Sequence, residues 1–243
     1  MRVDVAPTAE ALAGRSVEGV VVLVIDVLRA STTIVTALAN GCAAVVPVAD
    51  PEEARRRARA LPPGTVLTAG ERRGEPIQGF DLGNSPTDCT AERVRGRVIV
   101  FTTSNGTRAL LAARAAAAIG VAALVNVSAA ATWALGAGRD VTLLCAGERG
   151  AISLEDHVCA GLLAERLQRE APSATLTPAA EAAVRASCGY GKAVARLAQD
   201  SRWARHLART GRGDDVAACL VLDAVALVPV YLPDVDKVVS GRR

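Results

Sequence analysis

Short runs of β-branched and other apolar residues alternate along this chain with alanine-rich stretches of helical length. The apolar runs lie at 20–25, 43–48, 65–68, 97–102, 122–127 and 141–145. Each run has the length of a buried strand. A regular alternation of strand and helix is typical of α/β proteins, in which helices cover a largely parallel sheet. The pattern therefore predicts an α/β fold.

Two of the predicted helices carry clear end signals. Residues 31–41 read S-T-T-I-V-T-A-L-A-N-G and end in an Asn-Gly stop. The next helix begins with Asp50 as N-cap and Pro51 in its first turn, followed by two acids that suit the positive end of the helix dipole. Beyond residue 150 the pattern becomes mostly helical, with amphipathic stretches near 154–170, 178–186, 189–209 and 213–223. A last apolar run, A-L-V-P-V-Y-L, contains Pro229 and predicts an edge strand.

Two segments of the chain resemble each other. T-V-L-T-A-G-E-R-R-G aligns with V-T-L-L-C-A-G-E-R-G, which places Glu71 over Glu148, and the strand that ends in Asp26 aligns with the strand that ends in Thr103. We interpret them as two copies of a β-α-β-α-β unit, at about 20–75 and 97–150. The whole chain, 1–243, is then a single α/β domain with a helix-rich C-terminal part, 151–243. Polar residues at four strand ends would converge at one edge of the sheet, where α/β proteins bind ligands.

The first strand end is followed by an acid, a base and three hydroxyl groups. The segment I-D-V-L-R-A-S-T-T contains Asp26, Arg29, Ser31, Thr32 and Thr33. A buried acid costs free energy unless a metal or another cation compensates its charge. Hydroxyl groups and amides at a helix start, beside Arg29, suit a phosphate or sulfonate. The alternative is structural, with Ser31 capping the helix and Asp26 paired with Arg29.

The corresponding turn of the second copy is also polar. It contains Thr103, Ser104, Asn105, Gly106, Thr107 and Arg108. An Asn-Gly pair permits the left-handed backbone that lets successive amides face an anion. The turn has no lysine in the pattern of a P-loop, so nucleoside triphosphate binding is not indicated. An ordinary capped turn is the alternative.

Acidic residues follow the other strands of the two copies. Glu71 and Glu148 come directly after glycines, and Asp156 begins a helix after Ser153. Carboxylates with few accompanying histidines suit Mg²⁺ rather than zinc. Ser153 and Asp156 also fit a capping box, so Asp156 has two equally weighted interpretations. The candidate metal ligands are Asp26, Glu71, Glu148 and Asp156.

The segment 75–86 reads E-P-I-Q-G-F-D-L-G-N-S-P and is long for a connection in an α/β protein. Long loops in compact domains are usually functional. Its amide side chain Asn84 is therefore a candidate substrate-binding residue.

Composition and charge exclude several classes of function. The formal net charge is only +3, and two Trp, two Tyr and two Phe are too few for a nucleic-acid platform. The longest intense apolar run has about six residues, too short for a membrane span, and the first residues do not read as a signal peptide. Six separated cysteines spell no C-x-x-C motif, and two histidines give no support for a Ser-His-Asp triad. We expect a cytoplasmic protein without nucleic-acid or membrane partners, and a homodimer as the default assembly.

Four phrases together resemble a known family, the 2-phosphosulfolactate phosphatases of coenzyme M biosynthesis. They are V-I-D-V-L-R-A-S-T-T-I-V-T-A-L-A-N-G, G-E-R-R-G-E-P-I-Q-G-F-D-L-G-N-S-P, T-T-S-N-G-T-R-A-L and C-A-G-E-R-G-A-I-S-L-E-D-H-V-C-A-G. The resemblance implies a Mg²⁺-dependent phosphatase that converts 2-phosphosulfolactate to 3-sulfolactate and phosphate. It also implies a three-layer α/β/α fold, with a mostly parallel or mixed central sheet.

We hypothesise that Asp26, Arg29 and Glu71 are catalytic, with Asp26 as nucleophile or base. The hydroxyl groups of 31–33 and the turn 103–108 would bind phosphate and sulfonate oxygens. Two further hypotheses remain open. The same residues would serve a phosphatase for another small phosphorylated hydroxy acid, or a non-catalytic protein that binds small anions.

Overall fold

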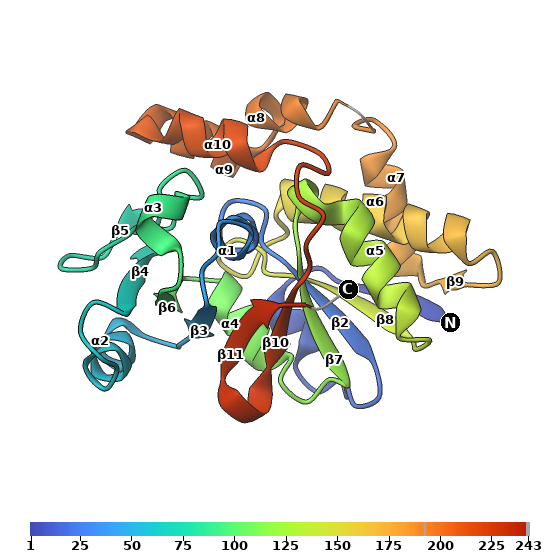
Figure 1. The fold of residues 1–243 in the computed structure, drawn as a ribbon. Helices are drawn as coiled ribbons and strands as arrows, with labels where there is room; N and C mark the ends of the chain where they lie inside the picture. The colour runs from blue at the N-terminus through green and yellow to red at the C-terminus, as the bar shows by residue number, and fades with distance from the viewer. Residues whose placement is uncertain (192, 242–243) are drawn as a thin grey trace.

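The computed structural model describes residues 1–191 and 193–241, which form a central sheet covered by helices (Figure 1). The strands are β1 (Arg2–Ala6), β2 (Val21–Ile25), β3 (Ala44–Pro47), β4 (Val66–Arg72), β5 (Glu75–Pro76), β6 (Val98–Thr102), β7 (Ala118–Ala122), β8 (Val141–Cys145), β9 (Thr175–Leu176), β10 (Pro229–Leu232) and β11 (Lys237–Ser240). Their order across the sheet is β5-β4-β6-β3-β11-β10-β7-β2-β8-β1-β9. The predicted α/β fold class is confirmed.

Helices flank the sheet and also extend beyond it. The α-helices are α1 (Ala30–Ala39), α2 (Pro51–Arg59), α3 (Ala91–Val94), α4 (Gly106–Ala112), α5 (Val127–Gly136), α6 (Leu154–Glu170), α7 (Pro178–Ser187), α8 (Leu197–Asp200), α9 (Arg202–Leu207) and α10 (Gly213–Cys219). Shorter helical turns are η1 (Ala9–Leu12), η2 (Leu124–Asn126), η3 (Val194–Arg196), η4 (Ala208–Arg212) and η5 (Pro233–Val235). The predicted cap of α2 is confirmed, because Asp50 accepts a hydrogen bond from the Glu53 amide.

Strand β2 shows why the molecule has three layers. All five of its residues are buried, and successive side chains of a strand point to opposite faces. Val21, Leu23 and Ile25 pack in a core with α5, α6 and α7. Val22 and Val24 pack in a second core with α1 and α4. Both faces of the sheet are therefore covered by helices.

Each of the two similar segments forms a β-α-β-α-β unit, and the units exchange their first strands. The first copy contributes β2, β3 and β4, and the second contributes β6, β7 and β8. Strand β2 lies between β7 and β8 of the second copy, while β6 lies between β3 and β4 of the first. Neither copy has a complete parallel sheet without the other.

The two parallel parts of the sheet run in opposite directions. Three antiparallel pairings, β3 with β11, β11 with β10 and β10 with β7, separate them. The four polar strand ends therefore do not lie along one edge of a single parallel sheet, which corrects that part of our expectation. They do converge as predicted, because residues at the carboxyl ends of β2, β4, β6 and β8 line one cavity.

The prediction of an edge strand at Pro229 was wrong. β10 lies in the interior of the sheet, between β7 and β11. Proline is tolerated there because Pro229 is the first residue of the strand, where its missing N–H removes little of the pairing. The strands β1, β5, β9 and β11 were not recognised in the sequence.

The strand predicted at 122–127 is also corrected, since β7 ends at Ala122. The chain turns there because Asn126 accepts a hydrogen bond from the Ala123 amide and donates to the Val121 carbonyl. The apolar run continues because Leu124 and Val125 are buried after the strand has ended. Burial is thus continuous across a change of secondary structure.

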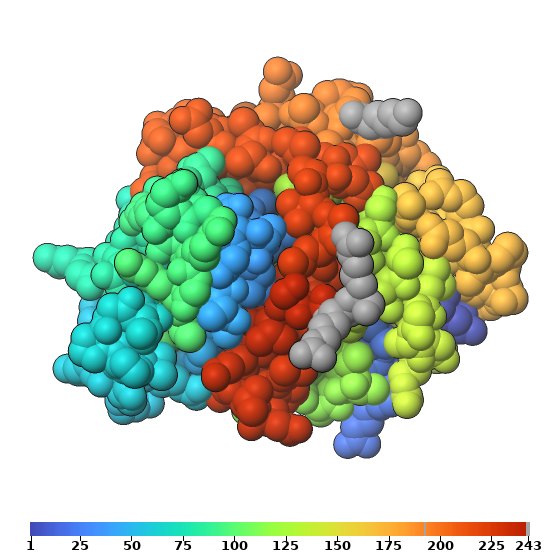
Figure 2. All heavy atoms as spheres, viewed as in Figure 1, coloured from blue at the N-terminus to red at the C-terminus, as the bar shows by residue number. Residues whose placement is uncertain are grey.

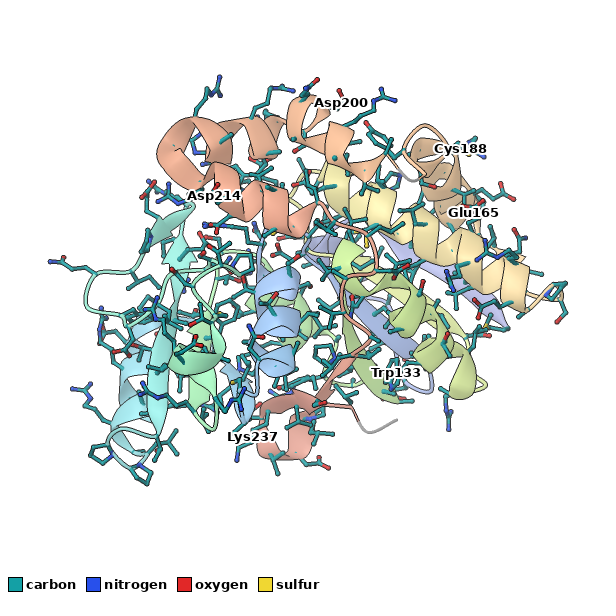
Figure 3. All side chains as sticks on the ribbon, turned by 45° about the horizontal axis from the view of Figure 1, so that its top comes forward. Trp133, Glu165, Cys188, Asp200, Asp214 and Lys237 are labelled. Carbon is teal, nitrogen blue, oxygen red and sulfur yellow. The ribbon has the colours of Figure 1, made fainter. Side chains whose placement is uncertain are left out.

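The C-terminal helices form a layer over the carboxyl ends of the strands. The helix predicted at 189–209 is interrupted at Ser201, whose hydroxyl caps α9 by accepting from the Ala204 amide. Figure 1 shows α8, α9 and α10 across the top of the molecule, and Asp200 and Asp214 mark this layer in Figure 3. Figure 2 shows the segment between α10 and β10, residues 220–228, running down between α1 and α5. In the described part of the chain, no helix has both the length and the apolar character needed to cross a bilayer.

The contact between α6 and α7 gives a test of this packing. A Cβ atom at Gly161 would lie 2.1 Å from the Ala183 carbonyl oxygen, so Gly161→Ala should lower the free energy of unfolding by about 1–3 kcal/mol. The control is Gly136→Ala at the end of α5, where a Cβ meets nothing within 4 Å. That change should raise the free energy by about 0.4–1 kcal/mol. Urea unfolding measures both, and equal effects would contradict the packing.

Candidate active site

A cavity of about 500 Å³ lies where the strand ends meet. Three carboxylates line it, one from each of three strand ends: Asp26, Glu71 and Glu148. Four arginines also line it: Arg29, Arg73, Arg108 and Arg149. Positive and negative groups thus face the same space, which suits a ligand with anionic groups and a reaction that moves protons.

Asp26 follows β2 directly and is almost fully buried at the cavity wall. Its backbone amide donates to Ser31 Oγ at 2.9 Å, and one carboxylate oxygen accepts from the Ala30 amide at 3.2 Å. Burial raises the pKa of Asp26 from 3.8 to about 7; the Ala30 hydrogen bond lowers it, and the charge of Glu71 raises it. A carboxyl group with this pKa exchanges protons near neutral pH.

Glu71 is held in place by the second copy. Its Oε1 accepts from the Ser104 amide at 2.7 Å, and its Oε2 accepts from the Gly74 amide at 2.6 Å and from Ser104 Oγ at 3.2 Å. The carboxylate therefore connects the end of β4 to the turn after β6. The predicted role of Ser104 is modified, because its hydroxyl lines the cavity but donates to Glu71.

Asp156 makes the matching connection on the other side. Its Oδ1 accepts from the Val27 amide at 2.8 Å and its Oδ2 from the Gly147 amide at 3.2 Å. It thus joins the turn after β2 to the end of β8. Burial, then the charges of Asp26 and Glu155, raise the pKa of Asp156. Unlike Glu71, Asp156 does not line the cavity, which argues against its predicted role as a metal ligand.

The alignment of Glu71 with Glu148 does not hold in space. Arg72 pairs with Glu75 across one tight turn, and Glu148 pairs with Ala151 across another. Glu148 therefore corresponds to Arg72, one position after Glu71. The Glu148 carboxylate lines the cavity but binds Arg202 of α9 at 3.0 Å.

Arg29 is buried and paired, but its partner is not Asp26. Its Nη1 donates to Asp215 of α10 at 2.6 Å, and its Nη2 donates to the Gly74 carbonyl at 2.9 Å. Ser85 and Thr87 donate to the other oxygen of Asp215. A buried ion pair needs such additional hydrogen bonds to offset its desolvation. Sequence patterns missed Asp215, because α10 reads as an ordinary amphipathic helix.

The three hydroxyls at the start of α1 do not line the cavity, which corrects their assignment to substrate binding. Ser31 Oγ bonds to the Asp26 amide and the Val24 carbonyl. Thr32 Oγ1 donates to the Val27 carbonyl at 2.9 Å. Thr33 Oγ1 is buried and has no hydrogen-bond partner among the described residues. The local backbone, rather than a ligand, uses Ser31 and Thr32.

The turn before α4 divides into buried and open residues. Thr103 and Thr107 are buried and hydrogen bond to each other, so neither reaches the cavity. Asn105 and Arg108 line the cavity. The expected left-handed backbone is wrong, because neither Asn105 nor Gly106 has a positive φ. Gly106 is required by close approach, since a Cβ there would lie 2.6 Å from Asp26 Oδ2.

Two further residues complete the wall. Asn84 is buried and lines the cavity, and its Oδ1 has no hydrogen-bond partner among the described residues. A buried polar atom without a partner is costly in a protein, so this oxygen is available to a ligand. Trp203 of α9 also lines the cavity and donates from its indole nitrogen to the Leu28 carbonyl at 3.2 Å. Sequence reasoning missed Trp203, because no local signal connects α9 with the strand ends.

The carboxylates fit a hard cation that needs few protein ligands. Within 1–191 and 193–241, no three His, Cys, Asp or Glu side chains form a metal-binding group. Mg²⁺ commonly takes one or two carboxylates and completes its octahedron with water and substrate oxygens. Asp26 and Glu71 satisfy this smaller requirement, because both line the cavity and their charges interact.

Comparison with known proteins gives a consistent result. Residues 6–233 match the profile of the family described as 2-phosphosulpholactate phosphatase. A protein from Symbiobacterium thermophilum is 41% identical over 225 residues, 93% of this chain and 94% of its own length. One from Gloeobacter violaceus is 42% identical over 206 residues, 84% of this chain and 85% of its own. Both are named "Probable 2-phosphosulfolactate phosphatase".

A more distant relative extends the match to both ends of the chain. A protein of the same name from Clostridium botulinum is 32% identical over 240 residues, 99% of this chain and all of its own length. The match therefore includes both copies of the repeat and the C-terminal helices over the cavity. The family profile spans both copies of the repeat, and these relatives match over most of their own length. This chain therefore belongs to the 2-phosphosulpholactate phosphatase family.

Proposed function

We propose that this protein hydrolyses 2-phosphosulfolactate to 3-sulfolactate and phosphate, with Mg²⁺ as cofactor. The observation that carries the proposal is the cavity at the strand ends, where arginines and carboxylates face each other. Family membership supports the reaction. The substrate has a phosphate, a sulfonate and a carboxylate, and arginine binds such oxyanions with paired N–H groups.

The phosphate would lie beside Asp26. Asn105 and Arg108 line the same cavity as Asp26, and Arg29 is fixed there by Asp215. A cation held by a buried partner keeps its orientation without the substrate. Preorganised charge of this kind stabilises a transition state without rearrangement during the reaction.

Asp26 would act as the base. Its carboxylate can take a proton from water as the water oxygen bonds to phosphorus. The bond between phosphorus and the substrate oxygen then breaks, and the same proton passes to that leaving oxygen. Attack by the Asp26 carboxylate itself is the alternative. A substrate whose phosphate group is made chiral with oxygen isotopes distinguishes them, because direct attack of water inverts the configuration at phosphorus, whereas formation and hydrolysis of an aspartyl phosphate retain it.

Asp26 and Glu71 would hold Mg²⁺, and bound Mg²⁺ would supply neutralising charge for the phosphoryl oxygens. Glu71 is fixed by Ser104 and Gly74, so its position does not depend on the cation.

A cytoplasmic location is supported by the six cysteines, all of which are free thiols and therefore suit a reducing compartment. A place in coenzyme M biosynthesis and a homodimeric assembly remain predictions.

Replacement of Asp26 tests the chemistry. Asp26→Asn should lower kcat by a factor on the order of 10³ or more, because the base is lost. The fold should not weaken at pH 8. Since the folded state raises the pKa of Asp26 to about 7, its stabilising contribution is complete below 3.8 and lost as the pH rises through about 7. The side-chain amide of the Asp26→Asn variant carries no charge at pH 8, so the variant avoids the cost of burying an ionised carboxylate. A near-normal kcat would contradict the assignment, and thermal unfolding at pH 8 checks the fold.

Gly106→Ala tests the geometry around Asp26. The new Cβ would lie 2.6 Å from both Asp26 Oδ2 and Ala30 Cβ, and a displacement near 1 Å at a reacting group can reduce the rate about 100-fold. Steady-state kinetics should show a lower kcat. Gly136→Ala, far from the cavity, is the matched control and should keep wild-type activity.

A substrate panel tests the function itself. We expect Mg²⁺-dependent phosphate release from 2-phosphosulfolactate at a higher kcat/KM than from phospholactate or 4-nitrophenyl phosphate, with loss of activity after chelation. Preference for another phosphorylated hydroxy acid would replace the substrate and keep the reaction. Binding without phosphate release from any compound would favour a non-catalytic anion-binding protein, and full activity after chelation would exclude Mg²⁺.

A further inference from the structure

Arg73 and Arg149 occupy matching positions in the two copies. Arg73 and Gly74 form the turn after β4, and Arg149 and Gly150 form the turn after β8. In each turn both residues have positive φ, at 56° and 88° in the first and at 52° and 77° in the second. This is the geometry of a two-residue type I′ turn. The repeat therefore places one arginine from each copy at the wall of the same cavity.

The left-handed backbone makes these arginines unusual. A side chain larger than glycine disfavours positive φ, and the residues that tolerate it best are Asn and Asp. Only four non-glycine residues of the described chain have positive φ, and the two arginines among them both line the cavity. An arginine at such a position, twice, indicates that its side chain has a use that offsets the backbone cost.

These two arginines also lack partners that the other cavity arginines have. Arg29 binds Asp215 at 2.6 Å, and Arg108 binds Glu10 at 3.2 Å. Neither Arg73 nor Arg149 makes a salt bridge with any residue in 1–191 or 193–241, and both are exposed. Their charges are therefore free for an external anion.

The turns that carry them are fixed at their bases. Glu71 accepts from the Gly74 amide, and the Arg73 amide donates to Ser104 Oγ at 3.2 Å. On the other side, Asp156 accepts from the Gly147 amide, two residues before Arg149. The backbone is thus positioned by buried carboxylates while each guanidinium group stays free to reach the ligand.

We infer that Arg73 and Arg149 form a two-sided clamp, in which each guanidinium group binds one of two acidic groups that flank the phosphoester of the substrate. The clamp deepens the proposed function, on which it rests, by assigning the residues that select substrates with two acidic groups. Arg29 and Arg108 remain with the phosphate. Two cations carried by separate turns favour a ligand with two anionic groups besides the phosphate over one with none.

The test uses glycine substitutions, because glycine adopts the left-handed turn without strain. Arg73→Gly and Arg149→Gly should each keep or raise the Tm. Each should lower the ratio of kcat/KM for 2-phosphosulfolactate to kcat/KM for 4-nitrophenyl phosphate by at least about tenfold, the factor expected for one lost charge-assisted contact. Arg56→Ala, an exposed arginine of α2 outside the cavity, removes the same charge and should leave this ratio unchanged. Arg73→Asn and Arg149→Asn provide second neutral variants that tolerate positive φ.

Binding of 3-sulfolactate, measured by calorimetry, separates this inference from the proposed function. It carries the two acidic groups and no phosphate. If both glycine variants bind it at least about tenfold more weakly than the wild type does, the clamp is supported. Failure of the wild type to release phosphate from 2-phosphosulfolactate would refute only the proposed function. Wild-type affinity in the variants, or equal losses of kcat/KM for both phosphate esters, would overturn the clamp whether or not the wild type is a phosphatase.

Discussion

Two buried carboxylates hold the centre of this molecule together. Glu71 binds the amides of Ser104 and Gly74, and Asp156 binds those of Val27 and Gly147. Each carboxylate thus joins a turn after the first strand of one copy to the end of the third strand beside it. These hydrogen bonds satisfy amides that would otherwise be buried without partners. The exchange of first strands between the copies makes these connections necessary, because each strand end lies beside the other copy.

The same arrangement explains the electrostatics of the cavity. Acids that hold the backbone accumulate near the strand ends, and Asp26 lies among them with little access to water. Its raised pKa follows from burial and from its acidic neighbours. Fixed cations such as Arg29 and free cations such as Arg73 counter this charge. Because the fold positions both positive and negative side chains around the cavity, the cavity can bind an anionic substrate and still contain a carboxyl group that exchanges protons near neutral pH.

The C-terminal helices close the structure over this cavity. Trp203 contributes to its wall, Asp215 fixes Arg29, and Arg202 binds Glu148. The helices above the site therefore contact both copies of the repeat, and Figure 1 shows them lying across the two sides of the sheet. A segment that reads as ordinary amphipathic helix in the sequence thus determines the shape of the site and the orientation of one of its cations.

The sequence by itself determined the alternation of strands and helices, the two copies and the strand ends that carry polar residues, because periodicity and local end signals are encoded within a few residues. It also placed Asp26, Glu71, Asn105 and Arg108 among the candidates that line the cavity. Only the tertiary structure decided that the copies exchange strands and run in opposite directions, that the hydroxyls of 31–33 face the backbone, and that Asp215 is the partner of Arg29. The physical reason is that a hydroxyl or a carboxylate has the same local pattern whether it binds a ligand or a buried amide. For Arg29 the group that decides is Asp215, 186 residues away in the chain, and only the packing of the C-terminal helices brings the two together.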